Sequence, residues 1–471
     1  LHDDASPVEA AALANATSGT AVLFAGGTVV VALIALWIAG IPSIGLMGVA
    51  SAVTVVVAMV AAVTLLPALL GLAGTKIDWL HVGRRRGGRR PVEPRNTVAA
   101  RWADHVGRHP WRYAIGAFLG LVALASPVVA MRTGMADDGT APTDTTYRRA
   151  YDLLAEGFGP GFNGPLTIVL DGADPVTVAR VREAIAGTDG VVTVHGPMVN
   201  PERDTTVLMA IPATSPQDAA TEALVRELRD DVLPAAVAGD GDHFVTGQTA
   251  AYIDISGRLG SRLPYFIAVV VALSFLLLML VFRSVVVPLK AAVMNLLSIG
   301  GAYGVVVAVF QWGWGSELIG LDSTVPVSPF LPMIMFAILF GLSMDYEVFL
   351  LSRVREEYVL TGESHRSVVD GLASTARVIT SAALIKISVF AAFLLTPDVE
   401  IKMFAVGLTV AVLIDASVVR MVLVPATMAL MGDANWWLPR WLERRLPRVD
   451  VEGAGIAAVQ TVDVNAEPAH V

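Results

Sequence analysis

An aspartate and a tyrosine stand together inside a stretch that is otherwise apolar enough to span a bilayer. The stretch runs from about residue 330 to 351 and contains Asp345 and Tyr346. A charge at the centre of a bilayer costs at least about 2.5 to 3.5 kcal/mol on insertion scales, so an acid in such a segment marks a functional site. A buried carboxylic acid can take up and release protons, and a tyrosine hydroxyl can donate to a carboxylate on an opposing helix. The pair therefore predicts proton-coupled transport.

Other polar residues in the neighbouring apolar segments could share this chemistry. Lys386 could tune the acid or neutralise it in a static ion pair, and Asp415 could carry protons or bond to a neighbouring span. Glu347 is two residues from Asp345 and therefore on a different helix face, where it could line an inner vestibule. We expect Arg420 to extend toward the inner membrane surface rather than to pair with Asp415.

Small residues beside the acid favour close helix packing. Gly341 and Ser343 would allow the approach of a second helix that a relay between two helices requires. Elsewhere, His105 and His109 have the i, i+4 spacing of metal ligands, but no carboxylate motif accompanies them. We interpret these two histidines as a surface pair and expect neither a metal site nor a cofactor.

The composition is that of a protein with many membrane spans. Of 471 residues, 55% are hydrophobic and 16% are charged, whereas globular domains carry about 25% charged residues. The absence of cysteine excludes disulfides, thiol nucleophiles and cysteine-bound metals. About 20 apolar residues cross a bilayer core of about 30 Å. Eight segments qualify: 20–39, 44–73, 111–131, 263–283, 286–311, 329–352, 376–396 and 401–431.

Charged residues predict which parts of the chain face the cytoplasm. Arginines crowd the connection between the second and third spans, and the positive-inside rule therefore places this connection inside. By alternation, residues 132–262 lie outside the cytoplasmic membrane and the C-terminus lies on its cytoplasmic side. The block 132–262 contains 10 Arg and 19 Asp plus Glu, and this acidic balance agrees with an external position.

The pattern of residues 132–262 predicts an α+β domain. Helix-like segments at 147–158, 175–186, 217–232 and 249–262 alternate with strand-like segments at 166–170, 191–194, 205–211 and 244–246. This order favours a ferredoxin-like fold with a split β-α-β unit. Helices cover one face of such a sheet, and the other face needs a partner.

The remaining segments complete the domain organisation. We expect two spans in 1–74, an Arg-rich linker at 75–110, one span at 111–131, five spans in 263–431, an interfacial amphipathic helix at 432–448 and a disordered tail at 449–471. Residues 19–69 resemble 376–427 in length and in their closing proline pattern, as in the internal repeats of transporters. Only the second of these repeats follows a span that carries an acid. The chain is therefore expected to be an N-terminally truncated part of a longer protein.

Four motifs resemble those of one protein family. They are FGPGFNGPL at 158–166, GLSMDYEVFLLSRVREE at 341–357, ARVITSAALI at 376–385 and IKMFAVGLTVAVLIDASVVRMVLVPA at 401–426. In these motifs the chain resembles the MMPL family of resistance-nodulation-division (RND) transporters. The resemblance implies an RND-type transmembrane bundle, of which spans five to twelve are present, with one extracytoplasmic porter domain. Lys386 departs from the family pattern, in which an apolar residue is expected.

The resemblance also implies a function. MMPL-type proteins export lipids or other hydrophobic compounds by using the proton-motive force. Asp345 and Tyr346 match one half of a proton relay, and its other half, an Asp-Tyr pair on span four, would belong to the missing N-terminal half. The residues of this chain alone are therefore expected not to transport. The alternatives are a non-transporting lipid-sensing or scaffold module for envelope assembly and a protein-export accessory of the same superfamily.

Negative findings narrow the function further. No P-loop, H-E-x-x-H or G-x-S-x-G motif occurs, so the sequence predicts neither ATP hydrolysis nor an enzyme of the metalloprotease or serine-hydrolase classes. The expected partners are membrane lipids, a hydrophobic or lipid substrate and protons. No nucleic-acid partner is expected, and the oligomeric state is left open.

Overall fold

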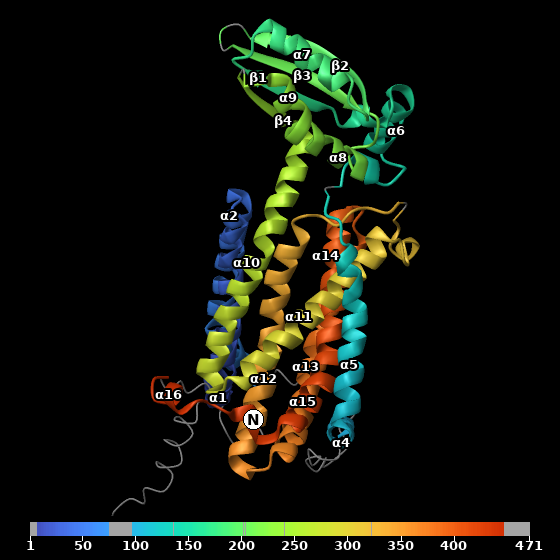
Figure 1. Ribbon diagram of the computed structural model, residues 1–471. Coiled ribbons are helices and arrows are strands. Elements are labelled where there is room, and N and C mark those ends of the chain that lie inside the picture. The colour runs from blue at the N-terminus through green and yellow to red at the C-terminus, as the bar shows by residue number, and fades with distance from the viewer. Residues whose placement is uncertain are drawn as a thin grey trace, which may run out of the picture.

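The described chain forms a bundle of long helices with a smaller α/β domain at one end (Figure 1). This computed structural model describes residues 7–74, 97–134, 136–200, 202, 204–239, 241–321 and 323–446. The side chain of Asp345 and several side chains near the start of the first helix lie outside the described part. Helices α4 and α16 lie at the end of the bundle opposite the α/β domain. We call this end the basal end.

Eight helical segments of the described chain are long and apolar enough to cross a membrane, which confirms the predicted number. Several begin with proline in the first turn, where a backbone N–H is not needed. The segments are α1 and η1 (Pro7–Ile34, Ala35–Ala39), α2 and α3 (Pro42–Val63, Leu65–Ala73), α5 and η4 (Pro110–Ala125, Ser126–Ala130), α10 (Gln248–Phe282), α11 and η8 (Val286–Val306, Val307–Gln311), α12 (Leu331–Thr361), α13 and η10 (Ser364–Ala392, Phe393–Leu395), and α14, η11 and α15 (Val399–Ile414, Asp415–Leu423, Val424–Met431).

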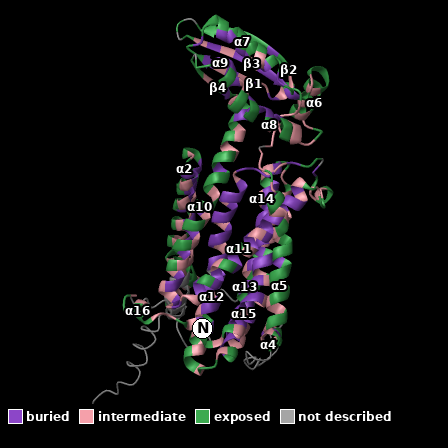
Figure 2. Ribbon diagram, viewed as in Figure 1, coloured by how far each residue is buried: buried purple, intermediate pink, exposed green. Residues whose placement is uncertain are grey.

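The centre of the bundle is formed by α11, α12 and the segment from α14 to α15. In the most apolar window of α12, 76% of the residues are buried, whereas none are buried in that of α2 and α3. Figure 2 shows the same contrast between central and peripheral helices. Peripheral helices such as α2 and α5 expose apolar side chains, as expected of surfaces that contact lipid. The central helices can therefore hold polar groups away from both lipid and water.

Glycines allow the closest contacts between helices. A Cβ atom at Gly304 of α11 would lie 1.7 Å from the carbonyl oxygen of Leu124 on α5. A Cβ atom at Gly341 of α12 would lie 2.6 Å from Cγ2 of Val29 on α1. Gly341 therefore packs closely, as a small residue in a membrane helix interface should, and its neighbour is α1.

The α/β domain contains a four-stranded antiparallel sheet with the strand order β2-β3-β1-β4. Strands β1 and β2 are joined through α7, and β3 lies between them, which is the topology of a split β-α-β unit. The elements are η5 (Asp138–Thr140), α6 (Thr146–Phe158), η6 (Pro160–Asn163), β1 (Leu166–Asp171), α7 (Pro175–Ala186), β2 (Val191–Asn200), β3 (Thr205–Pro212), α8, η7 and α9 (Ala219–Glu227, Leu228–Val232, Leu233–Val237), and β4 (Asp242–Thr246). The assignment of this unit as a ferredoxin-like porter domain stays a prediction.

The two faces of the sheet differ in burial. Leu166, Ile168 and Leu170 of β1 are fully buried against the helix layer, because alternate residues of a strand point to the same face. On the opposite face, Val169 pairs with Phe244 of β4, whose side chain is exposed. This exposed apolar face agrees with the expectation that it needs a partner, and the identity of that partner is left open.

Helix α10 joins the domain to the bundle without a break. The helix predicted at 249–262 and the span predicted at 263–283 form a single helix of 35 residues, with Pro264 inside it. The connection on the other side runs through residues 131–137, where Thr133 forms an isolated bridge with Val327. The domain is therefore attached to the bundle at two places.

The predicted amphipathic helix at 432–448 is wrong for the residues described. The chain forms the short 3-10 helix η12 (Gly432–Trp436), an extended stretch, and the four-residue helix α16 (Arg440–Glu443). Pro439 explains the interruption, because it lacks a backbone N–H and disfavours helical conformation in the residue before it. Of the predicted Arg-rich linker, residues 98–108 form α4 (Val98–Arg108). Residues 75–96 and 447–471, which include the predicted disordered tail, lie outside the described residues.

Candidate functional site

Tyr346 lies in the interior of the bundle between two basic side chains. Its ring is 8% exposed. The ammonium nitrogen of Lys386, on α13, is 4.1 Å from the centre of the ring, and the guanidinium carbon of Arg420, on η11, is 5.4 Å away. Both distances are within the range of cation–π interactions. Lys386 therefore contacts the predicted relay, while its pairing with Asp345 stays a prediction because that carboxylate lies outside the described residues.

Asp415 and Arg420 form a buried ion pair in the centre of the bundle. Arg420 Nε donates to Asp415 Oδ2 at 3.0 Å, and the side chain of Arg420 is fully buried. Ser343 Oγ lies 2.9 Å from Asp415 Oδ1 and 2.7 Å from Asn295 Oδ1. Arg420 also donates to the backbone oxygen of Ser343. The small side chain of Ser343 thus joins α12 to α11 and to η11 through hydrogen bonds.

The expectation that Arg420 extends to the membrane surface is wrong, and the local helix geometry gives the reason. In an α-helix, residues five apart point in different directions, since 3.6 residues make one turn. Residues Asp415–Leu423 instead form a π-helix, whose hydrogen bonds join residues five apart. This wider turn brings the Arg420 guanidinium over the Asp415 carboxylate. Each charge then compensates the other inside the bundle.

Glu347 lies one turn closer to the basal end and is also buried. Its side chain is 2% exposed, and within the described residues its Oε1 atom has no hydrogen-bond partner. The expected position facing an inner vestibule is therefore wrong. Glu347 interacts electrostatically with Arg420, Asp415 and Lys290. Lys290, on α11, is 6% exposed and donates to Asn435 Oδ1 at 3.2 Å.

A small cavity adjoins the ion pair. Its volume is about 10 Å³, and a water molecule needs about 10 to 15 Å³ measured in this way. Five polar side chains are among those that line it: Asn295, Ser298, Ser343, Tyr346 and Asp415. The cavity is therefore large enough for about one water molecule, which these side chains could bind.

Sequence reasoning missed three of these polar residues. Lys290 and Asn295 interrupt the apolar span of α11, and Asn435 follows the last span. A polar side chain within a span is itself a signal of function or of internal pairing, so Lys290 and Asn295 could have been found. Asn435 gives no such signal, because it lies outside the apolar stretch. Only the path of the chain brings it back against α11.

A second and much larger cavity lies between the α/β domain and the bundle. Its volume is about 620 Å³, within the range of ligand pockets. Arg132, Gln217, Tyr252 and Arg258 line it together with Asp137. The lining carries both positive and negative groups and is mostly polar. The predicted spans and helices did not indicate this cavity, because its walls come from five separate segments of the chain.

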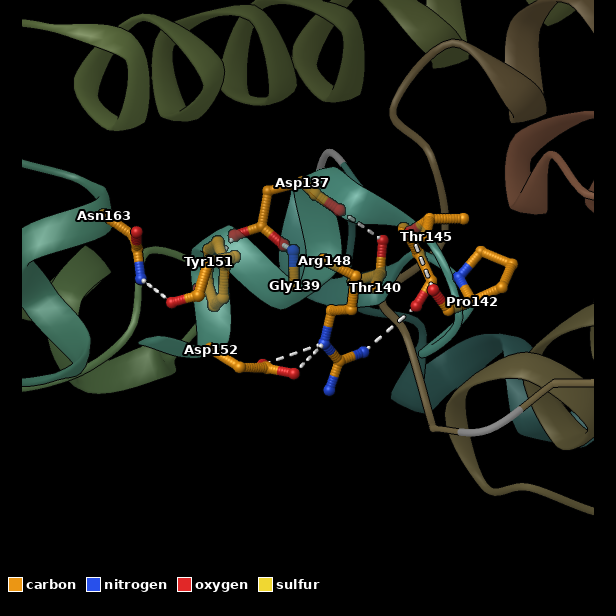
Figure 3. Close-up of polar contacts among 10 residues, drawn as sticks. Asp137, Gly139, Thr140, Pro142, Thr145, Arg148, Tyr151, Asp152 and Asn163 are labelled. Atoms are coloured by element: carbon orange, nitrogen blue, oxygen red, sulfur yellow. Dashed lines mark hydrogen bonds and ion pairs between the residues drawn. The ribbon is translucent and has the colours of Figure 1, made fainter. Parts of the chain in front are cut away.

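Asp137 ties the chain after α5 to α6 at the edge of this cavity. Figure 3 shows its carboxylate between the Gly139 backbone and the Tyr151 ring. Gly139 N–H donates to Asp137 Oδ1 at 3.0 Å, and Tyr151 OH donates to Oδ2 at 3.3 Å. Burial raises the pKa of Asp137, although these hydrogen bonds oppose the shift. Burial and the neighbouring Asp137 charge raise the pKa of Tyr151 to about 12.

Comparison with known proteins identifies the family. The sequence profile of the MMPL family matches residues 1–113 and 172–450. The chain belongs to the MMPL family. It is 39% identical to the membrane protein YdfJ of Bacillus subtilis over 450 residues, and 35% identical to the mycolic acid-containing lipids exporter MmpL11 of Mycolicibacterium smegmatis over 457 residues. The chain spans 61% and 47% of the lengths of these two relatives.

Two further similarities are to another relative and to a solved structure. The trehalose monomycolate exporter MmpL3 of Mycolicibacterium smegmatis is 33% identical over 359 residues, which cover 73% of the chain and 35% of that relative. Among solved structures, the hedgehog release protein Disp of the water bear Hypsibius dujardini matches with a TM-score of 0.58 at 13% identity, covering 88% of this chain and 58% of Disp. At this identity the match concerns the fold alone. The predicted family and the predicted class of polytopic helical bundle are confirmed.

Proposed function

We propose that this MMPL protein is a secondary transporter that exports lipids or other hydrophobic compounds across the cytoplasmic membrane and is driven by protons. The observation that carries the proposal is the buried cluster of ionisable groups at the centre of the bundle. Asp415, Arg420, Glu347 and Lys290 are each at most 6% exposed. Buried charges inside a membrane bundle are costly and typically belong to ion pathways or proton relays. The names of the two Mycolicibacterium smegmatis relatives, MmpL11 and MmpL3, favour a lipid as the exported compound.

The proposed proton relay uses Asp345 with Tyr346, and Asp415 beside them. Asp415 is held by Ser343 and Arg420 when it is ionised. Uptake of a proton would remove the negative charge and weaken the bond to Arg420, which also contacts the Tyr346 ring. Lys386 contacts the same ring, so a movement of Tyr346 would also change the surroundings of its ammonium group. Protonation of one acid could in this way shift α12 relative to η11 and α13.

The proposed orientation places the α/β domain outside the cell and the basal end inside. Arg101 and Arg108 lie on α4, at the basal end (Figure 1). This arrangement supports the positive-inside assignment, because the acidic domain lies at the opposite end of the bundle. The cavity of about 620 Å³ next to the domain would then open on the side to which an exported compound is released.

Reconstitution tests the proposal directly. The full gene product that contains these residues would be placed in liposomes with a pH-sensitive dye inside and a fluorescent long-chain lipid in one leaflet. An imposed proton gradient is expected to drive lipid translocation together with proton movement. We expect Asp345→Asn and Asp415→Asn each to lower the coupled rate by about 100-fold or more, as loss of a proton-transfer group typically does.

The control is an acid outside the cluster. Glu356 pairs with Arg353 near the basal end of α12, and both side chains are about half exposed. Glu356→Gln should therefore leave transport unchanged. Lipid movement that is equally fast without a gradient, or that survives both cluster substitutions, would contradict proton coupling and favour a lipid-binding or scaffold module.

A further inference from the structure

A column of buried polar side chains leads from the ion pair to the basal end of the bundle. It begins with Asn295, Ser343 and Asp415 at the level of the Tyr346 ring. Toward the basal end it continues through Glu347 and Lys290 to Asn435 and Ser284, which are both fully buried. Apolar residues surround this column on α11 and α12. These polar groups therefore lie one after another along the packed centre of the bundle.

Glu347 is the member of the column whose presence is hardest to explain by packing or stability alone. Ser343 and Glu347 are four residues apart on α12 and therefore share one face of the helix. Glu347 is 2% exposed, and its Oε1 atom has no hydrogen-bond partner in the described part of the chain. A permanently ionised acid in such a place is expensive unless it is paired and hydrogen-bonded. A group that alternates between its neutral and its ionised form fits this environment better.

The charged groups that interact with Glu347 come from α11 and η11. Lys290 approaches from α11, and Arg420 and Asp415 approach from η11. Lys386 of α13 lies on the Tyr346 ring, next to Glu347 in the sequence. Lys290 and Arg420 therefore interact with Glu347 and can stabilise its carboxylate after a proton has left. Lys290 can do so from the basal side, since Asn435 Oδ1 accepts from its ammonium group at 3.2 Å.

Asn435 is held in place by the C-terminal segment. Its side-chain amide donates to the backbone oxygens of Met428 and Gly432, and its own backbone oxygen accepts from Ser284 Oγ at 2.6 Å. Trp437 O accepts from Val285 N at 3.1 Å. The segment that follows the last span thus closes the basal end of the column over Lys290.

We propose that Glu347 and Lys290 form a second proton station between the Asp415 level and the cytoplasm, and that Asn435 closes it. This inference rests on the proposed function. A proton that leaves the relay adds to the Glu347 carboxylate, which becomes a neutral carboxylic acid. When the proton passes to water at the basal end, the carboxylate returns and the Lys290 ammonium group compensates its charge. Bonds to hydrogen break and form in each step, and no electrons are transferred.

The experiment measures the dependence of transport on the pH of each side in liposomes that contain the full gene product. The variants are Glu347→Gln, Lys290→Met and Glu347→Asp. We expect Glu347→Gln to lower proton-coupled flux about 100-fold and to abolish its response to the pH on the basal side. Glu347→Asp should retain flux with an altered response, and Lys290→Met should shift the pH at which the response occurs.

Lys402 provides a matched control. It is as buried as Lys290, at 6% exposure, but its ammonium group donates to the backbone oxygens of Ile319 and Gly320, at 2.7 and 3.1 Å. Lys402→Met should leave the response to basal pH as it is in the unmodified protein. A shift as large as that of Lys290→Met would overturn the special role of Lys290.

The double variant Glu347→Gln with Lys290→Met separates a proton station from a static pair. If the two groups only fill the core, a neutral pair of similar size should fold and transport with an unchanged pH response, and the proposal would be overturned. A folded double variant without coupled flux would support it. If the unmodified protein shows lipid movement but no proton dependence, the proposed function fails first, and the second station fails with it.

Discussion

At the scale of single residues, the pair of Asp415 and Arg420 dominates the centre of the bundle. Both charges are removed from water, and they are compensated by one another and by Ser343. In such a buried pair, the loss of one partner costs more than the loss of both, because a single remaining charge has no compensation. Substituting one or both residues therefore tests how much the stability of the bundle depends on this ion pair.

We predict that Arg420→Met lowers the free energy of unfolding by about 3 to 5 kcal/mol, since it leaves the Asp415 carboxylate buried with Ser343 as its hydrogen-bond donor. The double variant Arg420→Met with Asp415→Asn should recover most of this loss. Denaturant unfolding of the purified protein in detergent measures both. A loss below about 1 kcal/mol for the single variant would place the pair among weak, solvated ion pairs.

Asp137 leads to a prediction about pH outside the membrane. Burial raises its pKa in the folded protein above the ordinary value of 3.8. The folded state therefore binds the proton more tightly than the unfolded state. This contribution to stability is fully present below pH 3.8 and is lost as the pH rises through the higher pKa of the folded protein.

Asp137→Asn should remove this dependence, because an amide does not titrate there and can still accept from Gly139 N–H. We expect the stability of the variant to vary less between pH 3.8 and neutral pH. Hydrogen exchange of the α6 and η5 backbone measures the effect locally. Asp138→Asn, at an exposed neighbouring position, is the control and should follow the unmodified protein. Parallel pH curves for Asp137→Asn and the unmodified protein would contradict the prediction.

At the scale of elements, the close contact of α12 with α1 depends on a missing side chain. Only a glycine at position 341 lets α12 approach Val29 without displacing it. Close approach of small residues stabilises helix pairs in membranes, because van der Waals contacts replace the hydrophobic effect there. The central relay helix is thereby fixed against the first helix of the chain.

We predict that Gly341→Leu destabilises the bundle by about 1 to 3 kcal/mol, as overpacking of a tight interior typically does. Gly120 of α5 offers the matched control, because no atom lies within 4 Å of a Cβ placed there. Gly120→Leu should therefore leave the thermal midpoint unchanged or slightly higher. Equal midpoints for the two variants would show that α1 yields to the larger side chain.

At the scale of the whole molecule, the described helices place the acidic α/β domain and the basic α4 at opposite ends of the bundle (Figure 1). The absence of cysteine from the 471 residues makes this arrangement easy to test, because a single introduced cysteine is then their only thiol. Val176 on α7 is 71% exposed, and Val359 at the basal end of α12 is 75% exposed. A cysteine at either position should therefore react readily with a thiol reagent that reaches it.

We predict that a membrane-impermeant maleimide labels Val176→Cys in intact cells and labels Val359→Cys only after the cells are permeabilised. The physical basis is the positive-inside rule, applied to the arginines that precede α5. Labelling yield on a gel is the measurement. Reaction of Val359→Cys in intact cells would reverse the proposed orientation.

Local patterns were enough to predict the membrane-length helices and the strands of the described chain. Among the described residues, apolar segments of sufficient length located the eight membrane-length helices, and β-branched runs between turn residues located the four strands. Both follow from the solvent that surrounds each residue and from the spacing of side chains along a helix or strand. The acid at position 345 could be singled out for the same reason, since a charge in an apolar run is visible without the fold.

The tertiary structure decided which polar groups meet. Arg420 reaches Asp415 only because residues 415–423 form a π-helix, and an α-helical spacing predicts the opposite. Glu347 and Lys290 interact electrostatically across α12 and α11, and Asn435 returns to Lys290 from beyond the last span. These contacts join residues from 5 to 145 positions apart, so they depend on helix packing. The sequence by itself determined that charges lie in the membrane, and the packing of α11, α12 and η11 decided how they are compensated.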